Sequence, residues 1–495
     1  MTPGIGPIRS DIAARGARTP AWKALQLLAW FHSGIVLTFG ALLLFYRAPV
    51  GVRLDWLLTS RPGLLGLTLS ACASVCWAVV GARCWAAYRT GQRNHLRWLV
   101  RGTIAVLLFV GGAECALRAV AIEPLAGMIK KATVPPRSWR DMVSHERSYI
   151  EAARGPDTLF VFDPELGWTP TPNGVGQDGM SFISSEGLRA PRPDMSMRDE
   201  PADCKIAVLG DSLTFGSGAG FEDTWGYRVA ARFGHEIEKQ CVVLNFAVPM
   251  YSLGQMYLRY LRDVRPWRPD IVILGFTTDT TERTLDVYGF LLDPSWPNPW
   301  AHPRLVRRGE LLLPINTPLP KPQTIFSTNA IQKLPYIEYD VHYRPREWDR
   351  PAWRLADQFF LFRLVANWHP RWDPPRVEVD ELMLLTLNQA ILESFVREAK
   401  SAGSSPVIVY LPYPEEIGTA AGQEPRGIQI ARRSGVEFVD LTPCLAELAS
   451  RDRFIGAGPN YHPNAVDHLA KCILPALTPR VRRAHVPIGE RDPSS

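Results

Sequence analysis

One serine and one distant histidine carry the clearest potential for chemistry in this sequence. Ser212 belongs to the run Gly210-Asp211-Ser212-Leu213, which follows a short apolar segment, and His462 lies near the C-terminus. A serine hydroxyl is a weak nucleophile until a base takes its proton, and a histidine does this when a third group fixes its tautomer. Gly, Asp and Ser also favour ordinary turns. We therefore predict that Ser212 is a nucleophile and His462 its base, provided that the fold brings them together.

The residues around both positions resemble the sequence blocks of the SGNH/GDSL hydrolase family. The first block reads Gly-Asp-Ser-Leu-Thr-Phe-Gly-Ser-Gly from Gly210, the last reads Tyr461-His462-Pro463-Asn464, and the serine precedes the histidine as in the family. The resemblance covers roughly residues 157–480. It implies a three-layer α/β/α fold of the flavodoxin-like kind, attack on an ester through an acyl-enzyme, and no metal or organic cofactor. His468 is a competing histidine, but it lies inside an expected helix.

The third member of the triad departs from the family pattern. An Asp is expected two or three residues before the histidine, and this chain has Pro459 and Asn460 there. Asn460 can orient the imidazole by a hydrogen bond, but it cannot stabilise the imidazolium by charge. Loss of that carboxylate from a serine triad costs about 10⁴ in rate. Asp452 is a second candidate for the acid.

The oxyanion hole departs from the pattern as well. The resemblance implies three donors: the backbone N–H of Ser212, a glycine after the second strand and an asparagine after the third. Met250 stands at the glycine position and Asp279 at the asparagine position, which a shift of one residue would give to Thr278. The Met250 N–H can donate only if the backbone there tolerates a side chain. An ionised Asp279 repels an oxyanion, so it helps only if burial raises its pKa. The hydroxyls of Thr277 and Thr278 are alternative donors.

Two classes of function remain open from these residues. One is a serine esterase acting on acyl esters, such as acetyl groups on carbohydrate, or an O-acyltransferase that uses the same residues. The other is a catalytically degraded domain that binds a glycan or a protein.

The elements that must position these side chains follow an alternating pattern. Continuous Val, Ile and Leu runs separated by helical patterns indicate a parallel sheet covered on both faces. The expected strands are 206–209, 242–246, 271–275, 407–411 and 437–440. The expected helices are 222–234, 253–264, 377–402, 423–434 and 465–474.

The alternation breaks in an insertion at about 284–375, which is rich in Pro and Trp. So long a connection is usually functional, and its aromatic content argues against disorder. It is either a carbohydrate-binding lid or a small subdomain with its own core. Residues 305–315 predict a hairpin that turns at Arg308-Gly309.

Three apolar segments precede the hydrolase-like part, at about 25–46, 63–82 and 102–122. A bilayer takes about 20 helical residues, so each segment can cross it. Arginines and lysines before the first segment and after the second place those parts in the cytoplasm. We therefore expect a multi-pass protein of the cell inner membrane, with a linker at 123–156, a periplasmic domain at 157–480 and a tail at 481–495. If one segment does not cross, the domain is cytoplasmic.

The charge balance limits the classes of partner to be expected, and the cysteines offer two possible disulfides. The 55 basic and 49 acidic residues give a net charge of only +6, and no nucleic-acid-binding motif or zinc-site spacing is present. The expected partners are the membrane and an ester-bearing small molecule or carbohydrate, not nucleic acid. Cys204 and Cys241 begin neighbouring strands, and Cys444 and Cys472 lie near two late helices. Both pairs can form disulfides outside the cytoplasm, and the alternative is four buried thiols.

Overall fold

The computed structural model describes residues 108, 110–115, 143, 159–292, 299–343, 359, 361, 381–417, 424–455 and 460–477. The chain separates into two units, Met1–Ser138 with Arg344–Pro375 and a second unit, Trp139–Tyr343 with Arg376–Ser495. Almost all described residues belong to the second unit. Apart from 108, 110–115 and 143, the predicted membrane segments and the linker to 156 lie outside the described residues, as does the tail. In the described part of the chain, no helix has the length and apolar character needed to span a membrane.

The central sheet has seven strands: β3 (Phe182–Ile183), β4 (Arg189–Ala190), β5 (Cys204–Leu209), β6 (Cys241–Asn245), β7 (Ile271–Phe276), β10 (Ser405–Tyr410) and β11 (Phe438–Asp440). Their order across the sheet is β11-β10-β7-β5-β6-β4-β3. The five longer strands are parallel and match the predicted ranges to within two residues. The prediction of a purely parallel sheet is wrong at one edge, because β4 pairs antiparallel with β6 and β3 antiparallel with β4. Strands of two residues are too short to show a hydrophobic period.

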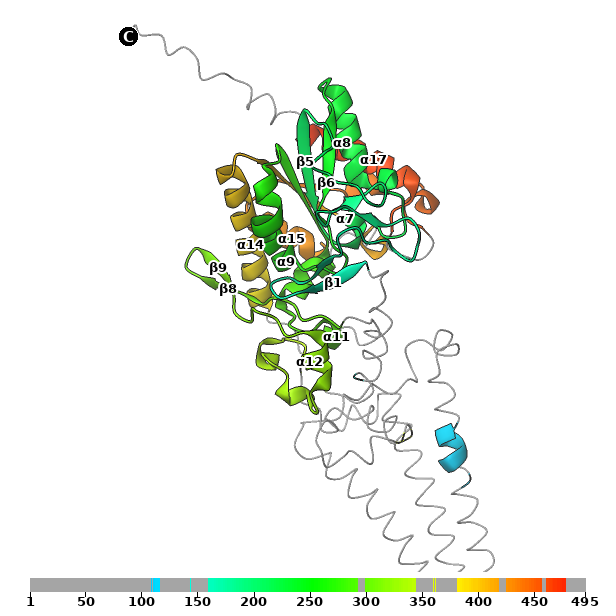
Figure 1. Cartoon of the computed structure of the whole chain (residues 1–495), viewed down its shortest axis with the longest axis vertical. Helices are drawn as coiled ribbons and strands as arrows, with labels where there is room; N and C mark the ends of the chain where they lie inside the picture. The colour runs from blue at the N-terminus through cyan, green and yellow to red at the C-terminus, as the bar shows by residue number, and fades with distance from the viewer. Residues whose placement is uncertain are drawn as a thin grey trace, which may run out of the picture. The chain divides into compact units, whose positions relative to one another are not determined.

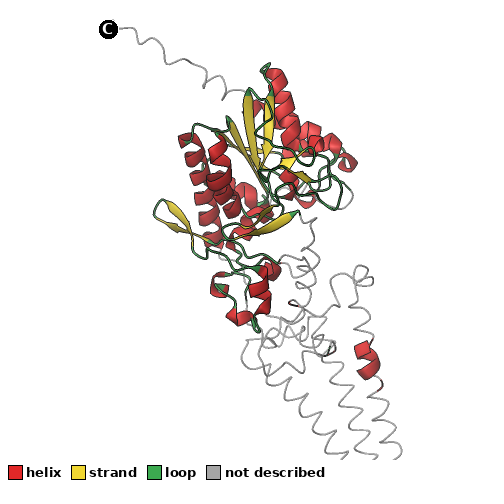
Figure 2. Ribbon diagram, viewed as in Figure 1, coloured by secondary structure: helices red, strands yellow, loops and turns green. Residues whose placement is uncertain are grey.

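Helices cover both faces of this sheet, as the sequence predicted (Figures 1 and 2). On β5, Ile206 and Val208 join one hydrophobic cluster, while Ala207 and Leu209 join another, because successive side chains of a strand point to opposite faces. The first cluster packs under α8 (Trp225–Glu236), α16 (Thr442–Ala446) and α17 (Pro463–Ile473). The second packs under α9 (Leu253–Arg259), α14 (Glu381–Ser401) and α15 (Arg426–Arg433). The result is a three-layer α/β/α arrangement.

The order of the parallel strands predicts where a site should lie. Numbered along the chain, these five strands have the order 2-1-3-4-5, which is the flavodoxin-like arrangement. The chain direction across the sheet reverses between β5 and β7, and open α/β sheets bind ligands at the carboxyl ends of the strands at such a point. Ser212 follows β5 and Asp279 follows β7. The fold therefore places both residues at the switch point.

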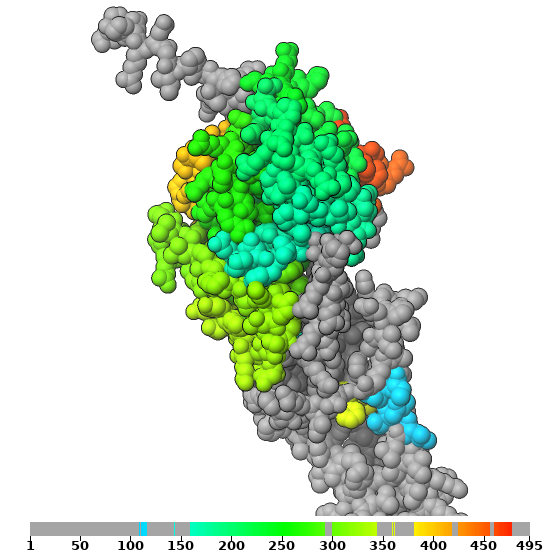
Figure 3. Space-filling model, viewed as in Figure 1, coloured from blue at the N-terminus to red at the C-terminus, as the bar shows by residue number. Residues whose placement is uncertain are grey.

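The described part of the insertion has its own hydrophobic core, which supports the subdomain interpretation (yellow-green in Figure 3). The predicted hairpin is confirmed as β8 (Leu305–Arg308) and β9 (Leu311–Pro314), which are antiparallel. Trp300 stacks on Trp168 with ring centroids 6.4 Å apart. The other tryptophans that suggested a sugar-binding lid lie outside the described residues. The core residues are Val287, Tyr288, Phe290, Ala301, Leu319, Ile325, Phe326, Ile331, Leu334 and Ile337.

Of the two alternatives for the four cysteines, disulfides or buried thiols, the structure has the two disulfides. Cys204 and Cys241 are directly opposite each other at the start of β5 and β6. Cys444 and Cys472 link α16 to α17 across a Cα–Cα distance of 6.5 Å.

Candidate active site

The serine loop is shaped by a close approach of backbone and side chain. A Cβ on Gly210 would lie 2.0 Å from Thr214 Oγ1 and 3.0 Å from the carbonyl oxygen of Gly275, so only glycine fits there. Asp211 then caps the short helix α7 (Ser212–Phe215) by accepting a hydrogen bond from the Leu213 N–H at 3.1 Å. Ser212 is thus the first residue of α7, half-buried, directly beyond the carboxyl end of β5.

A pocket brings Ser212 together with the loop that precedes His462. Ser212 lines it with Asn460 and Tyr461, although more than half of the hydrolase-like part separates these residues along the chain. His462 is the next residue and forms the N-cap of α17. The sheet therefore places the predicted nucleophile and the segment of the predicted base at one edge. The remaining lining residues are Leu213, Gly216, Ser217, Ala219, Asp223, Thr224, Trp225, Ile455 and Val466.

The imidazole of His462 is engaged in a local hydrogen bond through its Nδ1. Its Nδ1 accepts a hydrogen bond from the Asn464 N–H at 3.2 Å. A neutral imidazole whose Nδ1 accepts carries its proton on Nε2, which then donates rather than accepts. Over the described residues, the Ser212 hydroxyl has no hydrogen-bond partner, so the expected Ser212–His462 bond is not formed. For His462 to act as the base, its ring must first release the Asn464 N–H.

Neither candidate acid contacts the imidazole. Asp452 Oδ1 accepts a hydrogen bond from Asn464 Nδ2 at 3.2 Å, so Asn464 stands between this carboxylate and His462. Asn460 lines the pocket, and within the described chain its side chain makes no hydrogen bond to the ring. The group that orients His462 here is Asn464, which the sequence analysis did not consider. Its signal was local: a residue two positions after a helix N-cap can donate its N–H to the cap.

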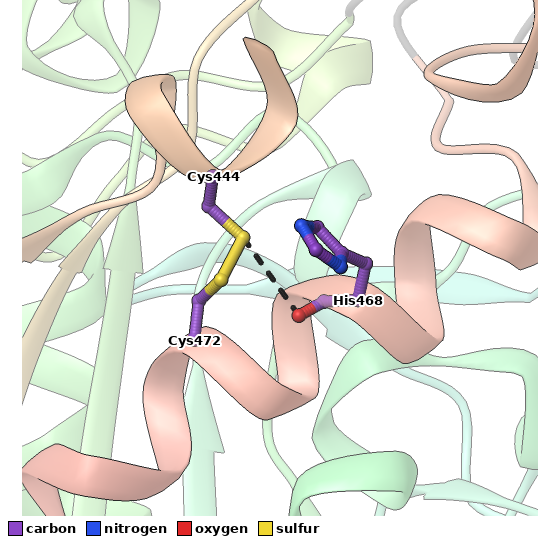
Figure 4. Close-up of side chains that lie close together, drawn as sticks. All are labelled: Cys444, His468 and Cys472. Carbon is purple, nitrogen blue, oxygen red and sulfur yellow. Dashed lines mark hydrogen bonds between the residues drawn. A yellow bond between two sulfur atoms is a disulfide. The ribbon is translucent and has the colours of Figure 1, made fainter. Parts of the chain in front are cut away.

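The competing histidine, His468, lies beside the disulfide of α17 (Figure 4). Its Nε2 is 3.0 Å from Glu447 Oε2, and its carbonyl oxygen is 3.7 Å from Cys444 Sγ. That second contact is packing, because a disulfide sulfur has no proton to donate. Ligand atoms of Cys444, His468 and Cys472 lie within 4.8 Å of one another, as in a metal site. Both sulfurs are joined in the disulfide, so the group offers no thiolate ligand.

Met250 occupies a backbone position that favours glycine. Tyr251 N–H donates to Val248 O at 3.3 Å, which makes Pro249 and Met250 the central residues of a turn. Met250 has φ +67°, as the second central residue of a type II turn requires. Its half-buried side chain packs on the hydrophobic core, and its N–H has no acceptor in the described part of the chain. The Val248 N–H donates to Gly210 O at 3.0 Å, so this turn lies beside the serine loop.

The hydroxyls after β7 are already bonded. The short helix α10 (Thr278–Glu282) begins there, and Thr277 caps it by accepting from the Thr280 N–H at 3.2 Å. The Thr278 hydroxyl donates to Glu416 Oε1 at 2.6 Å and lies 2.8 Å from the Tyr410 hydroxyl. An additional role for the Thr278 hydroxyl as an oxyanion donor would require it to leave Glu416.

Asp279 is not protected by burial, since 49% of its side chain is exposed. The burial on which a role for Asp279 as a neutral donor would depend is therefore absent. Its Oδ2 instead lies 3.3 Å from Nη2 of Arg283, one helical turn later. The sequence analysis missed Arg283, although an Asp and an Arg four residues apart share one helix face.

Arg283 also contacts the serine loop. Its Nη1 lies 3.7 Å from Oδ2 of Asp211, whose side chain is fully buried. Burial raises the pKa of Asp211, and the Arg283 guanidinium opposes that rise. Arg283 thus links the two loops of the switch point by charge.

Comparison with known proteins gives matches among solved structures. No family model matches this chain, and no curated protein does. The similar solved structures include a protein of Desulfitobacterium hafniense described as a lipolytic protein of the G-D-S-L family, which matches 56% of this chain and 100% of its own, at 13% identity and a TM-score of 0.28. A lipase/acylhydrolase from Enterococcus faecalis matches 56% of this chain and 96% of its own, at 11% identity and a TM-score of 0.29. An acetylxylan esterase from Geobacillus stearothermophilus matches 57% of this chain and 94% of its own, at 14% identity and a TM-score of 0.30. With similarities this low, the strand order and the site geometry must carry any assignment.

Proposed function

We propose that this protein is a serine esterase that cleaves acyl esters through an acyl-enzyme on Ser212. One observation carries the proposal: Ser212 begins α7 at the switch point of the sheet and lines a pocket with the residues that lead into His462. A nucleophile at that place can meet a bound ester and a base from another loop. The chemistry of the acyl group is drawn from the family resemblance, which favours small esters such as acetyl groups on carbohydrate.

The proposed reaction uses the groups at this edge of the sheet. Ser212 Oγ attacks the ester carbonyl carbon while its proton passes to His462, which has released the Asn464 N–H. The carbonyl oxygen becomes negative and accepts hydrogen bonds from the N–H groups of Ser212 and Met250. The alcohol leaves with the proton from His462, and water repeats the sequence to free the acid. Asn460 is the side chain whose amide oxygen we propose to accept a hydrogen bond from Nδ1–H, once the ring proton has moved from Nε2 to Nδ1.

A second function rests on the orientation of His462. Its Nδ1 is bonded to Asn464, and no carboxylate of the described residues reaches the ring. A serine hydrolase domain that had lost its acid would keep the pocket and bind a glycan or a protein without turnover. An O-acyltransferase is a variant of the first proposal, because a sugar hydroxyl would replace water in the last step.

We also propose that the domain lies outside the inner membrane, held by the apolar segments before residue 123. Two features support this location. The arginine and lysine distribution places the end of the third segment outside. Two disulfides in the second unit suit an oxidising compartment.

Labelling of the full-length protein by a fluorophosphonate tests the proposed nucleophile, because the reagent reports an activated serine without knowledge of the substrate. Wild type should be labelled and should turn over p-nitrophenyl acetate, and Ser212→Ala should abolish both. Ser217 lines the same pocket and provides the matched control, since Ser217→Ala should still be labelled. Absence of labelling in the wild type, or equal labelling of Ser212→Ala, would favour the binding module.

A further inference from the structure

Two carboxylates and one guanidinium meet where the loops after β5 and β7 come together. Arg283 has only 9% of its side chain exposed, and its two terminal nitrogens reach Asp279 at 3.3 Å and Asp211 at 3.7 Å. Arg283 Nη1 has no hydrogen-bond acceptor among the described residues, so it interacts with Asp211 by charge alone. One guanidinium therefore lies between two carboxyl groups beside the proposed nucleophile.

An unpaired carboxylate at this place would work against ester cleavage. The oxygen of the attacked carbonyl gains negative charge in the transition state, and a fixed like charge raises the energy of that state. At an effective dielectric constant of about 20, a carboxylate held about 6 Å from that oxygen would slow the step by roughly 100-fold. A chain with aspartate at position 279 must cancel this charge if the site is to react.

We propose that Arg283 is a positioning residue whose pairing with Asp279 allows an aspartate to occupy the oxyanion edge of an active site. This inference rests on the proposed function. The pair behaves as a neutral polar group, so that the Ser212 and Met250 N–H groups face no net negative charge from the β7 loop. Arg283 does not need to touch the substrate to have this effect.

The surroundings of the pair offer no other cation in contact with Asp279 among the described residues. Glu282, the neighbour in α10, pairs with Arg426 at 2.7 Å. The other ionisable groups that interact with the pair are Asp211 from the serine loop, Glu282 and Asp286 from the chain around Arg283, Tyr413 from the loop after β10, and the buried His302. His342 Nε2 lies 2.9 Å from Asp286 Oδ1. Among the described residues, loss of Arg283 would thus leave Asp279 without a cation in contact.

Four full-length proteins test the inference: wild type, Arg283→Gln, Asp279→Asn and the double variant. The measurement is the second-order rate of fluorophosphonate labelling at Ser212. Arg283→Gln should react roughly 100-fold more slowly than wild type at pH 8, because Asp279 is then unpaired. The double variant should recover to within about tenfold of Asp279→Asn, because the repelling charge is gone. The deficit of Arg283→Gln should also shrink as the pH falls toward the range where carboxylates protonate.

The control variant is Arg426→Gln, which removes a different ion pair from α10 and should leave the labelling rate unchanged. If Arg283→Gln does not fold, Arg283→Lys with and without Asp279→Asn makes the same comparison, with an expected loss of about tenfold. Replacement of Arg283 could also lower the labelling rate by the same factor in the wild type and in Asp279→Asn. In that case Arg283 only supports the fold. That result would overturn the inference while leaving the esterase proposal intact. A wild type that is never labelled would overturn both.

Discussion

A buried histidine in the insertion makes the stability of this protein depend on pH in a calculable way. His302 is fully buried, its backbone N–H donates to Val287 O at 2.8 Å, and its ring centroid lies 5.2 Å from that of Trp168. Burial lowers the pKa of His302 to about 4. In the unfolded chain His302 has its ordinary pKa of about 6.5, so between that pH and pH 4 it is protonated in the unfolded chain but largely neutral in the folded one. Relative to pH 7, the folded state should therefore lose roughly 2 kcal/mol at pH 5 and about 3 kcal/mol at pH 4 from this group.

Urea titrations of wild type and His302→Gln, followed by tryptophan fluorescence at pH 7, 5 and 4, measure this effect. The comparison must be a difference, because burial raises the pKa of Asp340 to about 6 and its protonation favours the folded state over a similar range. Asp340 titrates in both proteins, so its contribution largely cancels. Wild type should lose about 3 kcal/mol relative to His302→Gln between pH 7 and pH 4. A difference that stays constant over this range would refute the burial argument.

Two further predictions concern the serine loop and the second disulfide. Gly210→Ala should lower the free energy of unfolding by about 1–3 kcal/mol, because its Cβ meets Thr214. Gly220 lies beyond α7, where an added Cβ meets only Asp223 at 3.5 Å, so Gly220→Ala should be nearly neutral. Equal melting temperatures for the two variants would contradict the packing account. Replacing Cys444 and Cys472 by serine opens a link across a sequence separation of 28 and should cost roughly 3–4 kcal/mol, seen as a lower urea midpoint. An unchanged midpoint would show that the link does not stabilise the fold.

The sequence was sufficient for the parallel strands, because each is a Val, Ile or Leu run with a clear end. It was not sufficient to predict the short antiparallel strands at the edge of the central sheet. The strands β3 and β4 at that edge are too short to show a hydrophobic period, and so are the strands of a separate hairpin, β1 (Phe160–Asp163) and β2 (Gly167–Pro170). The helix predicted at 253–264 is continuous in sequence pattern, but after Arg259 it widens into a π-turn, Tyr260–Val264. Pattern alone does not distinguish these two helical forms.

At the candidate site, too, the sequence predicts where residues lie along the fold better than which side chains they contact. The position of Ser212 at a strand end was predictable from local sequence, and the family resemblance already marked Met250 as standing where a glycine is expected. The partners of His462 and Asp279 were not predicted. They depend on which N–H a ring nitrogen meets and on which side chain crosses between two loops, and these contacts follow from packing rather than from residue type.

The Cys204–Cys241 link has a consequence for how the sheet is assembled. The two cysteines are opposite each other in register. A slip of one residue would turn one sulfur to the far side of the sheet. Once β5 and β6 are paired, the two sulfurs can therefore be joined only in the native register, and the closed disulfide in turn excludes a slip of either strand.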